Sequence, residues 1–78
     1  MTNIQLPPDP EGMNDSRAAW AGKVIDLFIL TTGTNKEDAL ADLLADLIHW
    51  CDRQQVSFDC ELARARGHYE AETLGEDP

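Results

Sequence analysis

The stretch Thr34–Arg53, TNKEDALADLLADLIHWCDR, is the clearest guide to the fold. Its apolar residues recur at three- and four-residue steps, which places them on one side of an α-helix and would scatter them over both faces of a strand. Thr34 is predicted to cap the first turn while Glu37 reaches back to the Thr34 amide. The apolar arc covers about half of the helix, so the helix is expected to pack against two neighbours. The arc contains Leu40, Leu43, Leu44, Leu47, Ile48 and Cys51.

The opposite face of this predicted helix is acidic. Asp38, Asp42 and Asp46 lie at four-residue steps and form what we call the acidic ridge. Like charges at this spacing cost a few tenths of a kcal/mol each in an isolated helix. The ridge is either a solvated face that needs polar residues or a surface that a partner protein recognises. Trp50, at the margin of the apolar arc, is either a core residue or an interface anchor. The candidate partner-binding residues are therefore Asp38, Asp42, Asp46, His49, Trp50 and Asp52.

Two further helices are predicted on either side of this stretch. The first is expected to start with Asn14 or Asp15 as its cap and to run to about Thr32, where Gly33 closes it. Gly22 within it suggests a close helix crossing. The other is expected to start at Ser57 or Asp59 and to end near Thr73. The apolar stripes comprise Trp20, Val24, Leu27, Phe28 and Thr31, widened by Ile25 and Ile29, in the first of these helices, and Phe58, Leu62, Ala65 and Tyr69 in the other.

The predicted fold class is all-α, a small three-helix bundle with an extended, Pro-rich N-terminal arm. Residues 1–13 form the flexible arm, residues 14–74 the three-helix domain and residues 75–78 an acidic tail. The short link 54–57 predicts that the second and third helices are antiparallel or near-antiparallel neighbours. The expected core contains Trp20, Val24, Phe28, Leu40, Leu44, Leu47, Phe58, Leu62 and Tyr69.

The charge balance restricts the class of partner. With 15 acidic and 6 basic residues the net charge is −9, which argues against direct binding to nucleic acid or an anionic membrane, because phosphate contacts need Lys and Arg. No apolar run approaches the roughly 20 residues of a membrane span, and no signal-peptide core is recognised. A cytoplasmic protein is expected, as a monomer or small homo-oligomer whose protein partner has a basic surface.

No residue pattern indicates catalysis, a metal or a cofactor. His49, Cys51, Cys60 and His68 match no familiar zinc spacing. Both cysteines are interpreted as small core residues, because a bridge between them is disfavoured in a reducing compartment. The carboxylates lie on an open helix face with no pocket to shift their pKa values. We therefore expect no catalytic residues, no metal ligands and no cofactor.

The segment GTNKEDALADLLADLIHWCDRQQVSFDCELARARGHYEAET, residues 33–73, resembles a widespread type of small protein from prophages and bacterial mobile elements. The whole chain is similar in size, acidity and helical character to anti-CRISPR proteins. This resemblance implies a phage-type inhibitor that blocks a basic nucleic-acid-binding or nuclease-recruiting surface of a CRISPR-Cas surveillance complex. The alternative is a helical structural subunit that homo-oligomerises through an apolar face, with Trp20 and Trp50 as candidates.

Overall fold

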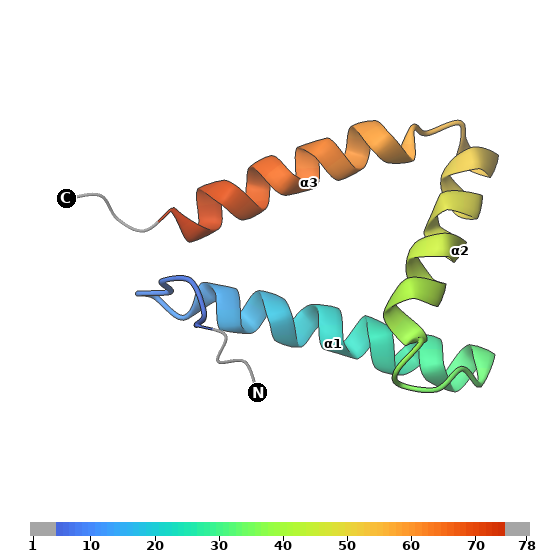
Figure 1. The fold of residues 1–78 in the computed structure, drawn as a ribbon, viewed down its shortest axis with the longest axis horizontal. Coiled ribbons are helices and arrows are strands. Elements are labelled where there is room, and N and C mark those ends of the chain that lie inside the picture. The colour runs from blue at the N-terminus through green and yellow to red at the C-terminus, as the bar shows by residue number, and fades with distance from the viewer. Residues whose placement is uncertain (1–4, 75–78) are drawn as a thin grey trace.

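A computed structural model describes residues 5–74 of the chain as three helices (Figure 1). They are α1 (Met13–Thr32), α2 (Ala39–Gln54) and α3 (Phe58–Thr73). The described residues contain no strand. The prediction of an all-α, three-helix domain is therefore confirmed. Residues 5–12 of the predicted arm contain neither helix nor strand, whereas residues 1–4 and the acidic tail 75–78 lie outside the described residues.

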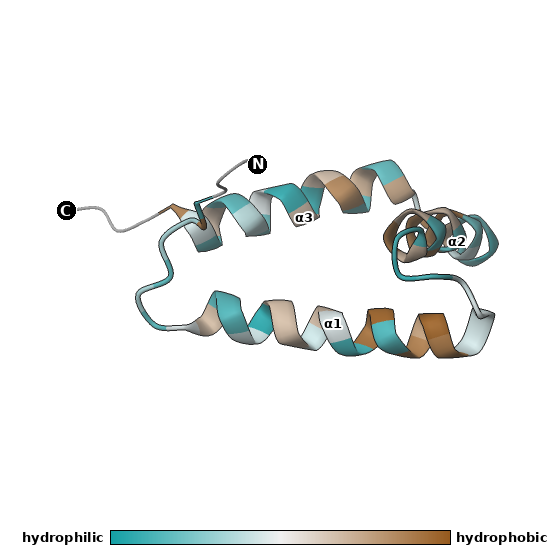
Figure 2. Ribbon diagram, turned by 60° about the horizontal axis from the view of Figure 1, so that its bottom comes forward, coloured by the Kyte–Doolittle hydropathy of each residue, from teal (hydrophilic) through white to brown (hydrophobic). Residues whose placement is uncertain are grey.

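The three helices form a U. α1 and α3 run in opposite directions, and α2 crosses from the end of one to the start of the other (Figure 1). In Figure 2, which is turned by 60° about the horizontal axis, α2 is seen nearly end-on while α1 and α3 are seen from the side. The axis of α2 therefore crosses the axes of both other helices. The predicted antiparallel pairing of the second and third helices is thus wrong. The link makes a corner instead, because Gln55 adopts a left-handed φ of 61° and Val56 N donates to the Cys51 carbonyl at 2.9 Å.

The start of α1 was predicted at the wrong cap. Neither Asn14 nor Asp15 caps the helix. Both backbone N–H groups donate to the Asp9 carboxylate, each at 3.0 Å, so a residue upstream of the helix satisfies the first turn. The predicted end is confirmed, since Gly33 has a φ of 77° and its N–H donates to the Ile29 carbonyl at 2.8 Å.

The start of α2 also differs from the prediction. Thr34 does not cap the helix, which begins at Ala39. The Thr34 hydroxyl donates instead to the Asp42 carboxylate at 2.7 Å. The Asn35 side chain accepts a hydrogen bond from Asp38 N at 2.8 Å, which stabilises a turn before the helix. Both predictions for α3 hold: Ser57 Oγ accepts from Cys60 N at 3.2 Å, and the helix ends at Thr73.

The arrangement is open. The radius of gyration is 15.0 Å, against about 11.5 Å expected for a compact domain of this length. The accessible surface is 6732 Å² for a chain of 8.7 kDa, whereas a compact monomer of that mass exposes about 4,700 Å². About 2,000 Å² more surface is therefore exposed than a closed three-helix bundle of this mass would leave.

The predicted core is correspondingly incomplete. Within residues 5–74 only Ala39 and Cys51 are buried hydrophobic residues. On α1, Ile25, Phe28 and Ile29 are half-buried, so this side of the helix provides its packing. Most of the expected core residues are exposed, namely Trp20, Val24, Leu40, Leu44, Leu47, Leu62 and Tyr69.

The helix α1 consequently has two apolar sides. One carries the half-buried residues, and the other carries Trp20, Val24 and Leu27, each more than half exposed. Hydrophobic residues concentrate in the second half of α1 and on α2 (Figure 2). The close crossing predicted at Gly22 is absent, because an added Cβ there would meet no atom within 4 Å.

Candidate functional site

The acidic ridge lies along the exposed side of α2. Asp42 and Asp46 are residues of this helix, and Asp38 precedes it with helical backbone angles of −98° and −7°. Because four residues of helix rise about 6 Å, the three Cα positions span about 12 Å in one row. All three residues are exposed. The structure therefore brings the predicted ridge together as a continuous surface.

The ridge carboxylates are not neutralised within residues 5–74. The ion pairs of this part of the chain join Arg17 to Glu72 and Arg64 to Glu61, and neither involves α2. Asp42 accepts the hydroxyl hydrogen bond of Thr34, which leaves its negative charge in place. The nearby Arg53 points its guanidinium along the helix, where it donates to the His49 carbonyl at 3.2 Å. The ridge therefore presents uncompensated negative charge to solvent.

The other candidate residues extend this surface. His49 and Asp52 are exposed. Since successive residues are about 100° apart around the helix axis, both lie within about 40° of Asp38 around that axis. Trp50 lies about 40° beyond Asp46 and is 55% exposed. The six candidate residues thus share less than half of the helix circumference. Trp50 is not a core residue of the single chain, and its indole is available beside the carboxylates.

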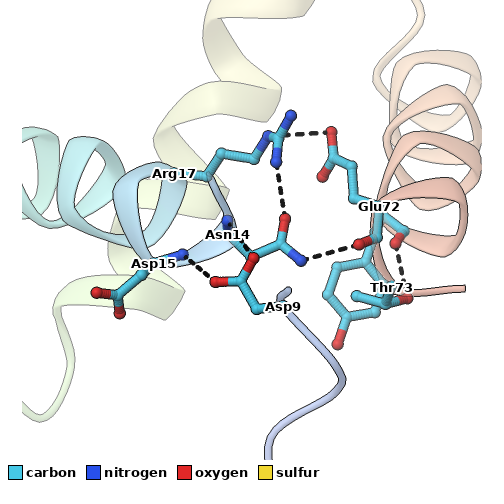
Figure 3. A network of polar contacts seen from close by, with 7 residues as sticks. Asp9, Asn14, Asp15, Arg17, Glu72 and Thr73 are labelled. Carbon is cyan, nitrogen blue, oxygen red and sulfur yellow. Dashed lines mark hydrogen bonds and ion pairs between the residues drawn. The ribbon is translucent and has the colours of Figure 1, made fainter. Parts of the chain in front are cut away.

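Sequence reasoning missed a second polar cluster, which we call the clasp and which comprises Asp9, Asn14, Arg17 and Glu72 (Figure 3). Asn14 Nδ2 donates to the Glu72 carbonyl at 2.8 Å, and Arg17 donates to Asn14 Oδ1 at 2.8 Å. Arg17 Nε lies 3.4 Å from Glu72 Oε2. The clasp joins the start of α1 to the end of α3. No sequence signal relates residues 58 positions apart, so only the contact itself reveals the pair.

A pocket of about 380 Å³ lies beside the clasp. Its apolar wall comes from Leu6, Pro7, Ala18 and Tyr69. Most of its lining residues are exposed, so it is a groove on the surface rather than an enclosed active site. It contains no serine, cysteine or histidine, so it offers none of the usual nucleophile–base pairs.

The residues weighed for metal binding are dispersed. Within residues 5–74 no group of three or more His, Cys, Asp or Glu side chains is placed to hold a metal ion. Cys51 is buried as predicted, but Cys60 is exposed, so its assignment to the core is wrong. Both thiols are free.

Comparison with known proteins gives no relative from which to transfer a role: no family model, curated protein or solved structure matches the chain. In the part of the chain that the structure describes, no helix combines the length and the apolar content needed to cross a bilayer.

Proposed function

We propose that this chain is a non-enzymatic, acidic protein–protein interaction module that acts in the cytoplasm. Its acidic ridge on α2 binds a basic surface of another protein, and Trp50 anchors the contact. The observation that carries the proposal is the row of exposed carboxylates of Asp38, Asp42 and Asp46, none of which forms an ion pair within residues 5–74. Lys and Arg side chains of a partner would supply the missing counter-charges.

The partner class follows from the spacing of the charges. Carboxylates about 6 Å apart along a helix approximate the phosphate repeat of an extended nucleic-acid strand. Lysines and arginines that normally hold backbone phosphates would therefore accept the ridge instead. We propose that the protein is a phage-type inhibitor, similar in character to anti-CRISPR proteins, that occupies a nucleic-acid-binding or nuclease-recruiting surface of a CRISPR-Cas surveillance complex. Direct binding to nucleic acid is disfavoured by the net charge of −9.

Trp50 provides the apolar part of this contact. A half-exposed tryptophan beside charged residues is a typical hot-spot residue, because its ring is desolvated when the partner covers it. The charges of the ridge would set the association rate and orientation, and burial of the indole would slow dissociation.

The test compares two variants with the same net charge. The ridge variant carries Asp38→Asn, Asp42→Asn and Asp46→Asn. Its matched control carries Glu11→Gln, Asp26→Asn and Glu70→Gln, so that each changes the net charge from −9 to −6 by removing three carboxylates. Tagged wild type is used to capture partners from host lysate at low and high salt, and each partner is then measured for binding to both variants.

The expected partner is a nuclease or guide-RNA complex that is captured at low salt and released at high salt or by added single-stranded RNA. The ridge variant should bind it about 10–100-fold more weakly, equivalent to about 1.4–2.8 kcal/mol, while the control variant stays within about threefold of wild type. Equal binding by the ridge variant and the control would refute the proposal, as would recovery of the chain alone at both salt concentrations.

A further inference from the structure

The exposed side of α1 forms a seam that is apolar except at Arg17 and Thr31. Met13, Trp20, Val24, Leu27 and Thr31 all lie on this side, and we call them the α1 seam. With Arg17 in the row, the steps alternate between four and three residues, which is the spacing of positions that meet in a coiled coil. Trp20 is 56% exposed, Val24 55% and Leu27 62%. The other side of α1 carries Ile25, Phe28 and Ile29, which are half-buried within the chain.

We infer that the α1 seam is the docking surface for a second copy of this chain, and that the protein is a homodimer paired through α1. This inference is independent of the acidic ridge, which lies on α2. It specifies which apolar face is used, and it leaves Trp50 outside the interface.

The amount of exposed surface fits a second copy. The chain exposes 6732 Å², about 2,000 Å² more than a compact monomer of its mass. A stable interface buries about 800 Å² on each partner. The excess is therefore larger than the area that a dimer contact would bury on each copy. Association is one of the ways in which a short chain with so small a core gains stability.

The distribution of charge selects the α1 seam among the apolar faces. Two copies with a net charge of −9 repel each other, so they can pair only where carboxylates do not meet. The acids of α1, Asp15 and Asp26, lie about 140–160° around the helix from the centre of the seam. Of the bases of α1, Arg17 lies within the seam row and Lys23 lies about 80° from its centre. The apolar arc of α2, by contrast, is bordered by the acidic ridge.

The clasp occupies the first part of the seam at Arg17, so the surface open to a second copy is that of Trp20, Val24, Leu27 and Thr31. Glu72 reaches the start of α1 from α3, but its carboxylate lies 3.4 Å from the Arg17 guanidinium and is neutralised there. An antiparallel or a parallel pair of α1 helices would both bury Trp20 against apolar residues of the other copy. The seam is thus a self-complementary surface, as a two-fold interface requires.

Sedimentation equilibrium of the full chain tests the inference. Wild type is expected to dimerise, and Leu27→Glu should raise the dimer dissociation constant at least ~100-fold, because two carboxylates would be buried without partners. Leu40→Glu is the matched control, since Leu40 on α2 is 60% exposed and Leu27 is 62% exposed. The control should change the constant by less than about threefold. A wild type that remains monomeric at all concentrations overturns the inference, as does a dimer that Leu40→Glu dissociates and Leu27→Glu does not.

A second measurement does not depend on the folding of Leu27→Glu. In Trp50→Phe, Trp20 is the only remaining tryptophan of the two in the chain. Its fluorescence emission should shift to shorter wavelength as the concentration passes through the dimer dissociation constant, because the indole leaves water. High salt should leave this shift unchanged or move it to lower concentration, because screening weakens the repulsion between acidic chains. An emission that stays that of an exposed indole while sedimentation reports a dimer would overturn the seam.

Discussion

Replacing Asp9 with alanine should destabilise α1 although Asp9 lies outside that helix. The Asp9 carboxylate accepts two backbone hydrogen bonds, from Asn14 N and Asp15 N, each 3.0 Å long. The residue at the conventional cap position, Gly12, has no side chain to replace it. Losing a side-chain cap costs about 0.5–2 kcal/mol, and the carboxylate also favours the positive end of the helix, so we expect about 1.5 kcal/mol. The midpoint of thermal unfolding should then fall by roughly 6–12 °C.

The assay is urea and thermal unfolding followed by far-ultraviolet circular dichroism, with all variants at one chain concentration because association shifts the midpoint. Asp9→Asn keeps one side-chain oxygen and should lose about half as much stability. Asp26→Ala removes an exposed carboxylate from the middle of the same helix and should change stability by less than about 0.5 kcal/mol. If Asp9→Ala and Asp26→Ala have the same unfolding free energy, the two hydrogen bonds do not hold the helix and the capping argument is wrong.

Three further changes test the local structure by the same unfolding assay. Gly33→Ala should lower the free energy of unfolding by about 1 kcal/mol, because φ is 77° there and an L-residue is strained. Gly67→Ala should raise it by up to about 1 kcal/mol, since the added Cβ meets no atom within 4 Å. Equal changes in the two variants would contradict this expectation. Ser57→Ala should cost about 1 kcal/mol through the lost cap, and an unchanged midpoint would exclude that role. Arg17→Ala should lower the free energy of unfolding by less than about 1 kcal/mol, because its partner Glu72 is partly exposed. It should nevertheless speed amide hydrogen exchange in the last turn of α3. Unchanged exchange would show that the clasp does not restrain that end of the helix.

Local signals in the sequence predicted that the three helices exist better than they predicted the residues at which the helices begin. Gly33 and Ser57 were predicted to end α1 and to cap α3, and the structure confirms both. The start of α2 was missed because Asn35 rather than Thr34 stabilises the turn before the helix. Asn35 Oδ1 accepts from Asp38 N at 2.8 Å, and the helix begins only at Ala39. The capping role of Asp9 was missed because Asp9 lies four residues before Met13, and cap prediction considers only residues adjacent to the first turn.

The candidate site could be predicted because it depends on one helix. The relative positions of Asp38, Asp42 and Asp46 follow from helical periodicity alone, so their common exposed side was accessible from the sequence. The core could not be predicted from the sequence, because α1 has apolar residues on both sides. Periodicity groups Trp20 with Val24 and Leu27, but it does not tell which side meets α2. The side of α1 that meets α2 is set by the link 33–38, where Gly33 has a left-handed φ of 77° and Asn35 accepts from Asp38 N.

The open fold and the strong acidity are consistent with two separate contacts. A chain with a net charge of −9 associates with itself most readily through a surface poor in carboxylates, and the α1 seam is such a surface. Since the acidic ridge lies on a different helix, pairing through α1 leaves one ridge on each copy for a partner. A dimer would then present two ridges, and a partner with two basic sites would gain affinity from the second contact whenever the geometry allows both. The two contacts should respond oppositely to salt, because screening weakens attraction to a basic surface and also weakens the repulsion between acidic copies.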